Sequence, residues 1–245
     1  LLAENNFLPE LSNIPEHIAK KSKMMWINYP NNPTAASADF GFFKHVVEFA
    51  RRYDILVCHD VAYAELAYDN FKPMSFLEVG GAKEIGVEFY SVSKTYNMAG
   101  CRLGFVAGNK DVVSKLALIK SNIDYGVFLA VQEAGIAALT GPQDCVADTA
   151  RIYQRRRDVL VNGLGKIGWD IPKPSASMFI WAPLPPGYTS SYALVSDLLE
   201  KAGVVVVPGS AFGRQGEGYV RIAMVKDETL LAEAVRRIGE NFSFK

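Results

Sequence analysis

The chain has 245 residues, and its 26 basic and 26 acidic side chains give a formal net charge of zero at neutral pH. This balance excludes an electrostatic case for binding nucleic acid or an anionic membrane. Hydrophobic residues make up 49% of the chain and charged residues 21%, which is typical of a globular protein. The longest apolar stretch, 128–139, is interrupted by Gln132 and Glu133, so no run reaches the ~18 residues that a membrane-spanning helix needs.

The cysteines and histidines do not form a recognisable metal or redox motif. Cys58, Cys101 and Cys145 are odd in number and widely separated, which favours a reducing, cytoplasmic environment. The three histidines lie far apart in the sequence. The sequence therefore gives no support for metal catalysis.

The first part of the chain alternates buried strands with helices. Residues 1–22 are expected to form an irregular lead-in with a short helix. Short apolar runs predict strands, and apolar residues at helical spacing predict helices. The expected strands are 24–29, 55–59, 87–91 and 103–107, and the expected helices are 39–53, 111–121, 128–140 and 144–166. Four arginines on the last helix indicate a solvated face, because the net charge is zero.

From residue 169 the pattern changes to shorter elements. Strands are expected at 178–182, 204–207 and 219–224, and helices at 190–202 and 227–242. Gly203 and Asp227 stand where a C-cap and an N-cap are expected. Residues 209–218 are rich in glycine but match neither a dinucleotide fingerprint nor a P-loop, so we interpret them as a flexible approach to Arg221. The pattern predicts a second, α+β domain.

A lysine follows the strand expected at 87–91. Ser91 and Ser93 stand at the end of this strand. Lys94 comes directly after Ser93, and Arg102 lies eight residues beyond Lys94. Ligands of α/β proteins bind at such strand ends. A lysine among apolar residues can act as a nucleophile, while two hydroxyls and a guanidinium suit a phosphate. This combination suggests pyridoxal phosphate held as a Schiff base on Lys94; a surface lysine in a polar loop is the alternative.

The stretch 91–104 resembles the cofactor-lysine motif of the fold-type I, class I/II pyridoxal-phosphate-dependent aminotransferases. Residues 29–34, Tyr-Pro-Asn-Asn-Pro-Thr, are similar to the Asn-Pro-Thr-Gly signature of the same family, although on their own they predict only a turn. The resemblance implies that Asn32 donates a hydrogen bond to the phenolate oxygen of the cofactor. Ala35 replaces the usual glycine, and it would be strained if the backbone there needs a positive φ.

Two further motifs follow in the family's order. Asp60, at an expected strand end, could simply cap a helix, but the resemblance implies that it pairs with the protonated pyridine nitrogen. Tyr63 would share the phenolate oxygen with Asn32. Arg221 could be an edge residue of a strand, but the resemblance implies that it grips the substrate α-carboxylate, for which its bidentate geometry is suited.

The resemblance also implies an architecture. We expect an α/β three-layer sandwich with a mostly parallel sheet, forming a partial large domain over residues 1–145, and a C-terminal α+β small domain over residues 146–245. Ser91, Ser93 and Arg102 are expected at the phosphate, and the protein is expected to be a homodimer. Family members are longer on the N-terminal side, so the sequence looks like the C-terminal part of such an enzyme, with a ring-stacking aromatic residue and one phosphate contact upstream of residue 1.

The activity implied is transfer of an amino group between an L-amino acid and a 2-oxo acid. Lys94 would move the proton at the substrate Cα as general base and acid. The lead-in 4–9 and residues 31–33 resemble the branch containing LL-diaminopimelate aminotransferases, and aspartate or glutamate-type substrates are also compatible. A carbon–sulfur lyase of the same fold and a non-catalytic, aminotransferase-like sensing module are the alternatives.

Overall fold

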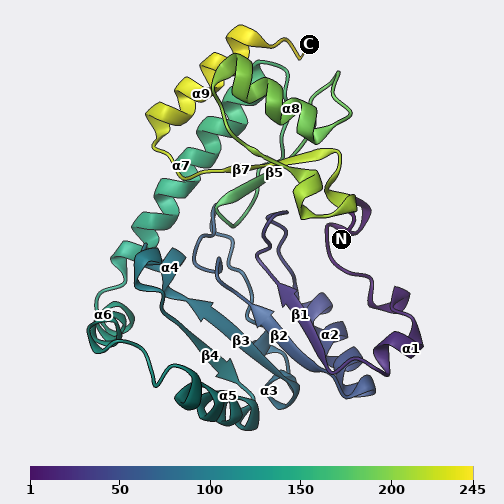
Figure 1. Cartoon of the computed structure of the whole chain (residues 1–245), viewed down its shortest axis with the longest axis vertical. Helices are drawn as coiled ribbons and strands as arrows, with labels where there is room; N and C mark the ends of the chain where they lie inside the picture. Colours follow the sequence, from purple (N-terminus) through teal and green to yellow (C-terminus); the bar gives the residue numbers. More distant parts are fainter. Residues whose placement is uncertain (245) are drawn as a thin grey trace.

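The computed structural model describes residues 1–244, which form two units, each built on its own sheet (Figure 1). The first sheet has four strands in the order β1-β2-β3-β4, and the second has three in the order β5-β7-β6. The strands are β1 (Met24–Asn28), β2 (Leu56–Asp60), β3 (Gly86–Ser91), β4 (Gly104–Gly108), β5 (Phe179–Pro183), β6 (Val207–Pro208) and β7 (Tyr219–Ala223).

The first sheet is mostly parallel, which confirms the predicted fold class. Strands β1, β2 and β3 run parallel, and β4 is antiparallel to β3. Asn28 is paired with Asp60, and Asp60 is paired with Phe89. The carboxyl ends of the three parallel strands therefore meet at one edge of the sheet, where α/β proteins bind their ligands.

The helices lie close to the predicted ranges. They are α1 (Glu16–Ala19), α2 (Phe40–Tyr53), α3 (Ala82–Ile85), α4 (Val92–Thr95), α5 (Lys110–Ile123), α6 (Leu129–Thr140), α7 (Asp144–Lys166), α8 (Ser191–Asp197) and α9 (Glu228–Asn241). Within residues 1–244, no helix combines the length and apolar character required to cross a membrane.

Helix α2 shows how local sequence builds the first core. The Asp39 carboxylate accepts a hydrogen bond from the Phe42 amide at 2.8 Å and caps the helix. Apolar side chains at helical spacing, including Phe43 and Val46, are fully buried against β1 and β2. The helix ends where Asp54 adopts the left-handed conformation, with φ 54°.

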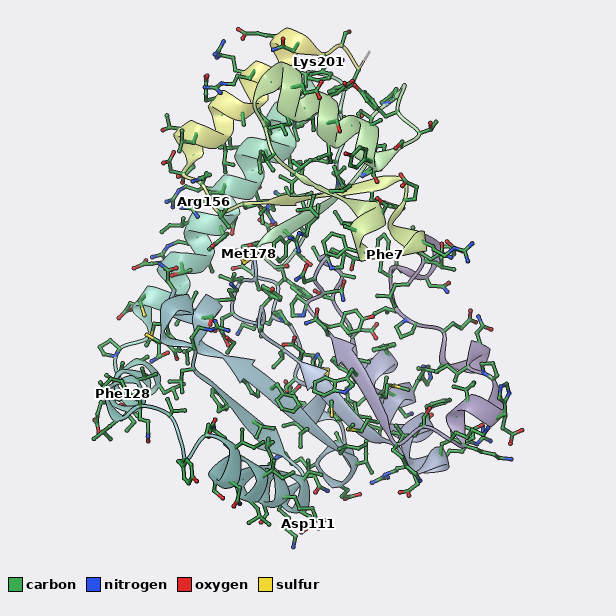
Figure 2. The ribbon with its side chains drawn as sticks, in the orientation of Figure 1. Phe7, Asp111, Phe128, Arg156, Met178 and Lys201 are labelled. Atoms are coloured by element: carbon green, nitrogen blue, oxygen red, sulfur yellow. The ribbon has the colours of Figure 1, made fainter. Side chains whose placement is uncertain are left out.

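The second unit has a separate core. Helices α8 and α9 and the second half of α7 pack on the small sheet, and α7 runs from the first unit to the second along one side of the molecule (Figure 1). Tyr63, Leu66, Met178 and Phe179 form a third cluster, and Met178 lies between the two sheets (Figure 2). The domain boundary between residues 145 and 146 stays a prediction; it falls in the first turn of α7.

Two predicted elements of the second unit are shorter than expected. The helix predicted at 190–202 is α8 followed by a π-helical segment, Leu198–Ala202, which ends at Gly203 with φ 63°. The Val204 amide then bonds to the Leu198 carbonyl. Because Val204 takes part in this turn, the next strand begins later in the chain. β6 therefore contains only Val207–Pro208 instead of the whole of 204–207.

The glycine-rich segment 209–218 is anchored rather than a loose approach to β7. It contains the 3-10 turns Gly209–Phe212 and Arg214–Gly216. The backbones of Gly209 and Gly216 pack so closely that an added Cβ would come within 1.9 or 2.0 Å of the opposite carbonyl oxygen. The Glu217 carboxylate also accepts a hydrogen bond from the Ser191 amide at 2.6 Å. Glycine is required here because two backbones approach each other.

Candidate functional site

The carboxyl edge of the first sheet collects most of the predicted site residues. The turn after β1 carries Asn32, β2 ends at Asp60, and β3 ends at Ser91 with Lys94 in the following turn of helix. These three strands are neighbours in the sheet. The strand order therefore brings residues from three separate motifs to one edge.

Asparagine side chains hold the turn after β1. The Asn28 amide nitrogen Nδ2 donates to the Asp60 carbonyl at 2.8 Å, and Asn28 Oδ1 accepts from the Asn32 amide, also at 2.8 Å. Asn31 Oδ1 accepts from the amide and the hydroxyl of Thr34. Side chains of this type stabilise turns by replacing backbone partners.

Ala35 replaces the usual glycine of the signature, and a positive φ at this position would strain it. Its φ is 58°, in the left-handed region. A Cβ in this region costs about 1–2 kcal/mol, whereas glycine is not penalised. The turn is nevertheless closed, because the Ala35 amide donates to the Asn31 carbonyl at 2.9 Å. The alanine is therefore accommodated with local strain.

Arg221 reaches this edge from β7 of the second sheet. Its Nη1 donates to Asn32 Oδ1 at 2.8 Å, joining residues 189 positions apart in the sequence. The guanidinium carbon lies 4.3 Å from the ring centre of Phe179 and 4.8 Å from that of Phe212, within the range of cation–π attraction. Burial lowers the pKa of Arg221, and Tyr63 opposes this effect. Nε of Arg221 is buried without a hydrogen-bond partner among residues 1–244.

Tyr63 lies close to the same group. Burial and the Asp60 carboxylate raise the pKa of Tyr63, while Asn32 and Arg221 act in the opposite direction. The phenol therefore keeps its proton and can donate a hydrogen bond. Residues 62–65 form a turn and no helix follows Asp60 directly, so this aspartate is not a helix cap.

The segment after β3 is organised by its serines. Ser91 Oγ accepts from the Ser93 amide at 3.2 Å and caps α4. Lys94 is half-buried, and within residues 1–244 its amine has neither a hydrogen bond nor an ion pair. Arg102 is exposed and donates to the Ala99 carbonyl at 3.0 Å. No hydrogen bond joins Arg102 to Ser91 or Ser93 in the described part of the chain.

One hollow at this edge includes only part of the group. A space of about 490 Å³ beside β1 is lined by Asn28, Asn31 and Asp60 together with residues of β1 and the lead-in. Neither Lys94 nor Arg221 lines it. The structure thus joins Asn32 to Arg221 by a hydrogen bond and places Tyr63 near enough to both for each to affect its pKa. Lys94 lies in α4, directly after β3.

The two rings beside Arg221 were not identified from the sequence. Phe179 lies two residues before Trp181, the direct strand partner of Arg221, so strand alternation could have placed it on the same face. Phe212 lies in the glycine-rich segment, where no periodic signal exists. Only the folded arrangement brings that ring to the guanidinium.

The donors and acceptors at this edge fit pyridoxal phosphate. The ring nitrogen of that group needs an acceptor, its phenolate oxygen needs donors, and its aldehyde needs an amine. Asp60 supplies a carboxylate. Among the described contacts, the Tyr63 hydroxyl donates to no acceptor and the Lys94 amine has no partner. The serine hydroxyls at the start of α4 are donors of the kind that a phosphate needs.

Comparison with known proteins identifies relatives along almost the whole chain. The family model "Aminotransferase class I and II" matches residues 1–238. An LL-diaminopimelate aminotransferase of Moorella thermoacetica is 55% identical, and one of Syntrophobacter fumaroxidans is 53% identical. Each comparison covers 97% of this chain and 61% of the relative. The chain thus spans about three-fifths of the length of these relatives.

Solved structures of the same kind superpose closely. BacF from Bacillus subtilis has a TM-score of 0.94 at 39% identity, covering all of this chain and 63% of BacF. A probable N-succinyldiaminopimelate aminotransferase from Thermus thermophilus has a TM-score of 0.89 at 36% identity, covering 97% of this chain and 63% of that protein.

Proposed function

Because the chain belongs to the class I and II aminotransferase family, we propose that it carries the lysine and carboxylate-binding parts of an enzyme that transfers an amino group between an L-amino acid and a 2-oxo acid. Members of this family depend on pyridoxal phosphate. The observation that supports this activity most directly is the bond from Arg221 to Asn32. It joins an arginine suited to a carboxylate to the edge that carries Asp60 and Lys94.

Each residue at this edge has a role in the proposal. When bound, pyridoxal phosphate supplies an aldehyde that reacts with amines and a protonated ring that withdraws electrons from carbon. Lys94 would hold the aldehyde carbon, and its amine would move the proton at the substrate Cα as general base and acid. Asp60 would keep the ring nitrogen protonated, while Asn32 and Tyr63 would donate to the phenolate oxygen. The phosphate would be bound by Ser91, Ser93 and Arg102.

Arg221 would bind the α-carboxylate of the amino acid. Its Nε lacks a partner among residues 1–244, its Nη1 is directed by Asn32, and two aromatic rings flank its plane. A planar guanidinium held in this way can offer two parallel N–H groups to one carboxylate. A lysine at this position would provide a point charge without that geometry.

LL-diaminopimelate is the amino acid that we propose as substrate. Two relatives more than 50% identical to this chain carry the name LL-diaminopimelate aminotransferase. Aspartate or glutamate-type substrates would be handled by the same carboxylate-binding arginine. Competition assays between these amino acids, with formation of the corresponding 2-oxo acid as the measurement, distinguish the two cases.

We also propose a homodimer in the cytoplasm. Helices α5 and α6 expose several large apolar side chains: Leu118, Ile119, Ile123, Leu129, Ile136 and Leu139. Phe128, between these helices, is 74% exposed and lies on the outer side of the molecule (Figure 2). Apolar patches of this kind mark interaction surfaces, and a second copy would cover them. Three free cysteines are compatible with a reducing compartment.

Covalent trapping tests the assignment of Lys94. The chain is mixed with pyridoxal phosphate, reduced with borohydride and digested, and the modified lysine is located by mass spectrometry. We expect the label on Lys94 and its loss in Lys94→Ala. Lys115→Ala, which removes an exposed lysine of α5, should leave the label unchanged. Equal labelling of many lysines, with no preference for Lys94, would contradict the assignment.

Product analysis separates transfer from the two alternatives. Amino-group transfer yields a 2-oxo acid and an aminated cofactor, whereas a carbon–sulfur lyase yields pyruvate and ammonia. A sensing module would bind amino acid or cofactor without forming either product. The proposed transferase activity requires the first outcome in the whole protein, and formation of pyruvate and ammonia would assign the lyase instead.

A further inference from the structure

A buried histidine and a buried glutamate lie directly beneath the proposed site and have no role in it so far. His59 on β2 and Glu88 on β3 are strand partners, and both side chains are completely buried. His59 Nδ1 lies 2.8 Å from Glu88 Oε1. Because side chains alternate along a strand, His59 faces the side of the sheet opposite to that of its neighbour Asp60.

The Glu88 carboxylate is saturated with donors. Oε1 accepts from His59 Nδ1 and from the Phe76 amide at 2.7 Å, and Oε2 accepts from Ser75 Oγ at 2.7 Å and from the Tyr90 hydroxyl. Burial raises the pKa of Glu88, but the hydrogen bonds from His59, Tyr90 and Ser75 together bring it below its ordinary value. The carboxylate is therefore an ionised acceptor, and the Nδ1 atom of His59 carries a hydrogen directed at it.

The other side of the imidazole faces the peptide groups of Tyr29. His59 Nε2 lies 3.0 Å from the Tyr29 carbonyl oxygen and 3.3 Å from the Tyr29 amide nitrogen. The ring of Phe43 packs edge-on against the imidazole, with centres 5.1 Å apart. Glu88 thus orients the imidazole, and the imidazole fixes the backbone immediately after β1.

Tyr29 is the first residue beyond β1 and leads into the turn that carries Asn32. The Asn32 backbone is held by Asn28 Oδ1, and its side chain is held by Arg221. A shift of the Tyr29 backbone would therefore move Asn32 relative to both Asn28 and Arg221. The same imidazole belongs to the residue that precedes Asp60, so one buried pair supports two strand ends.

We propose that His59 and Glu88 are positioning residues that set the place of the turn at Asn32 and, through it, the geometry between Asn32 and Arg221. Glu88 holds the imidazole, and the imidazole holds Tyr29. At metal sites, removing the partners that orient the ligands from behind typically costs ten- to a hundredfold in affinity, and we expect an effect at the lower end of that range here. The consequence for cofactor binding rests on the function proposed above, whereas the consequence for Asn32 does not.

Two substitutions break this chain of contacts, and a third serves as a matched control. Glu88→Gln replaces the carboxylate, and Tyr90→Phe is a milder change that removes one donor to it. Val57→Ala alters a fully buried residue on the same strand and the same face as His59, without touching a polar contact. All three are compared at conditions where each protein is equally folded.

The first measurement is the ¹⁵N NMR signal of the Asn32 side-chain amide in the cofactor-free chain. We expect this signal to shift in Glu88→Gln and, to a smaller extent, in Tyr90→Phe, and to remain in place in Val57→Ala. If Glu88→Gln does not fold, Tyr90→Phe decides. An unmoved Asn32 signal in the polar variants, or an equal shift in Val57→Ala, would overturn the positioning role.

The second measurement is the affinity for pyridoxal phosphate, followed by the absorbance of the bound cofactor. We expect about tenfold weaker binding in Glu88→Gln and no comparable loss in Val57→Ala. If the parent chain binds no cofactor under conditions where the intact protein does, the variants are compared in the intact protein. If the intact protein also binds none, the proposed function fails, while the Asn32 signal still decides the positioning role.

Discussion

The two units of this protein differ in how completely they cover their own cores. In the second unit, α8 and α9 cover the small sheet, and Leu194, Leu198 and Val220 are fully buried. In the first unit, α5 has no buried residue, and Trp26 on β1 and Phe105 on β4 are 60% and 44% exposed. Figure 1 shows α5 beside β4, at the end of the molecule away from the small sheet.

The second unit covers most of its apolar surface with its own helices, whereas the first unit leaves apolar surface that another layer must cover. An apolar helix face or sheet edge is stable in water only when another layer covers it. The second unit finds most of that layer in α7, α8 and α9, with Tyr68 of the first unit completing its core. The first unit leaves two edge strands and two helices open, which is why we propose that a second copy covers α5 and α6.

The sharpest test of the comparison is a pair of leucine truncations. Leu198 is fully buried and Leu118 is 66% exposed. Leu198→Ala should lower the free energy of unfolding by about 3 kcal/mol, because it removes apolar contacts and leaves a cavity. Leu118→Ala should change it by less than about 0.5 kcal/mol. Urea unfolding of the monomeric chain measures both changes. A similar large loss in the two variants would mean that α5 is covered within the single chain, without the proposed second copy.

Substitution of Arg157 tests the contact between the two units. This buried arginine of α7 donates to Asp69 Oδ2 at 2.7 Å and to the Pro174 carbonyl at 2.9 Å, and it lies over the Tyr68 ring. Arg157→Ala should cost about 2–3 kcal/mol, because it removes buried packing and leaves the Pro174 carbonyl without this donor.

The exposed Arg151 on the same helix provides the control. Its ion pair with Asp148 is on the surface, where such pairs contribute little. Arg151→Ala should therefore change the free energy of unfolding by less than about 0.5 kcal/mol. A loss equal to that of Arg157→Ala would show that the buried contacts of Arg157 do not explain its effect, because alanine itself favours the helix at both positions.

Both units should lose stability at low pH, but added salt should reduce this loss only in the second unit. In the first unit, the net effect of burial and hydrogen bonding lowers the pKa of Glu88 below 4.5. Its ionised form therefore contributes stability above that pH, and the contribution is lost as the pH falls through the folded-state value. In the second unit, Arg236 and Arg237 lower the pKa of the half-exposed Glu233 to about 2, and the sign is the same.

Salt distinguishes the two carboxylates because only the exposed pair is screened. Unfolding measured between pH 7 and pH 3 should show a Glu88-dependent loss that is absent in Glu88→Gln and persists at high salt. The part that depends on Glu233 should shrink as salt is added. An acid response of Glu88 that disappears at high salt would argue against its buried environment.

The smallest expected effects come from the two helix ends. Asp54 ends α2 with φ 54°, and Gly203 ends the helical segment of the second unit with φ 63°. Asp54→Gly should stabilise by about 0.5–1 kcal/mol, because it removes a strained Cβ and a negative charge at a helix C-terminus. Gly203→Ala should destabilise by about 1 kcal/mol. Thermal unfolding measures both, and changes of the same sign would contradict this explanation.

The sequence alone determined most elements of the fold and the motifs of the candidate site. Helices such as α2 and α7 and strands such as β2 depend on local periodicity, which is present in any short window of the chain. The order of Asn32, Asp60, Lys94 and Arg221 was sufficient to indicate the family. Ala35 was also identified as a position where φ would matter.

The tertiary structure decided the contacts that connect distant residues. The bond from Arg221 to Asn32, the ring of Phe212 over the guanidinium and the pair formed by His59 and Glu88 depend on how strands and units pack. The short β6 depends on the turn at Gly203 that precedes it. Local patterns carry no record of such partners, because the free energy of these contacts arises only when segments far apart in the chain are brought together.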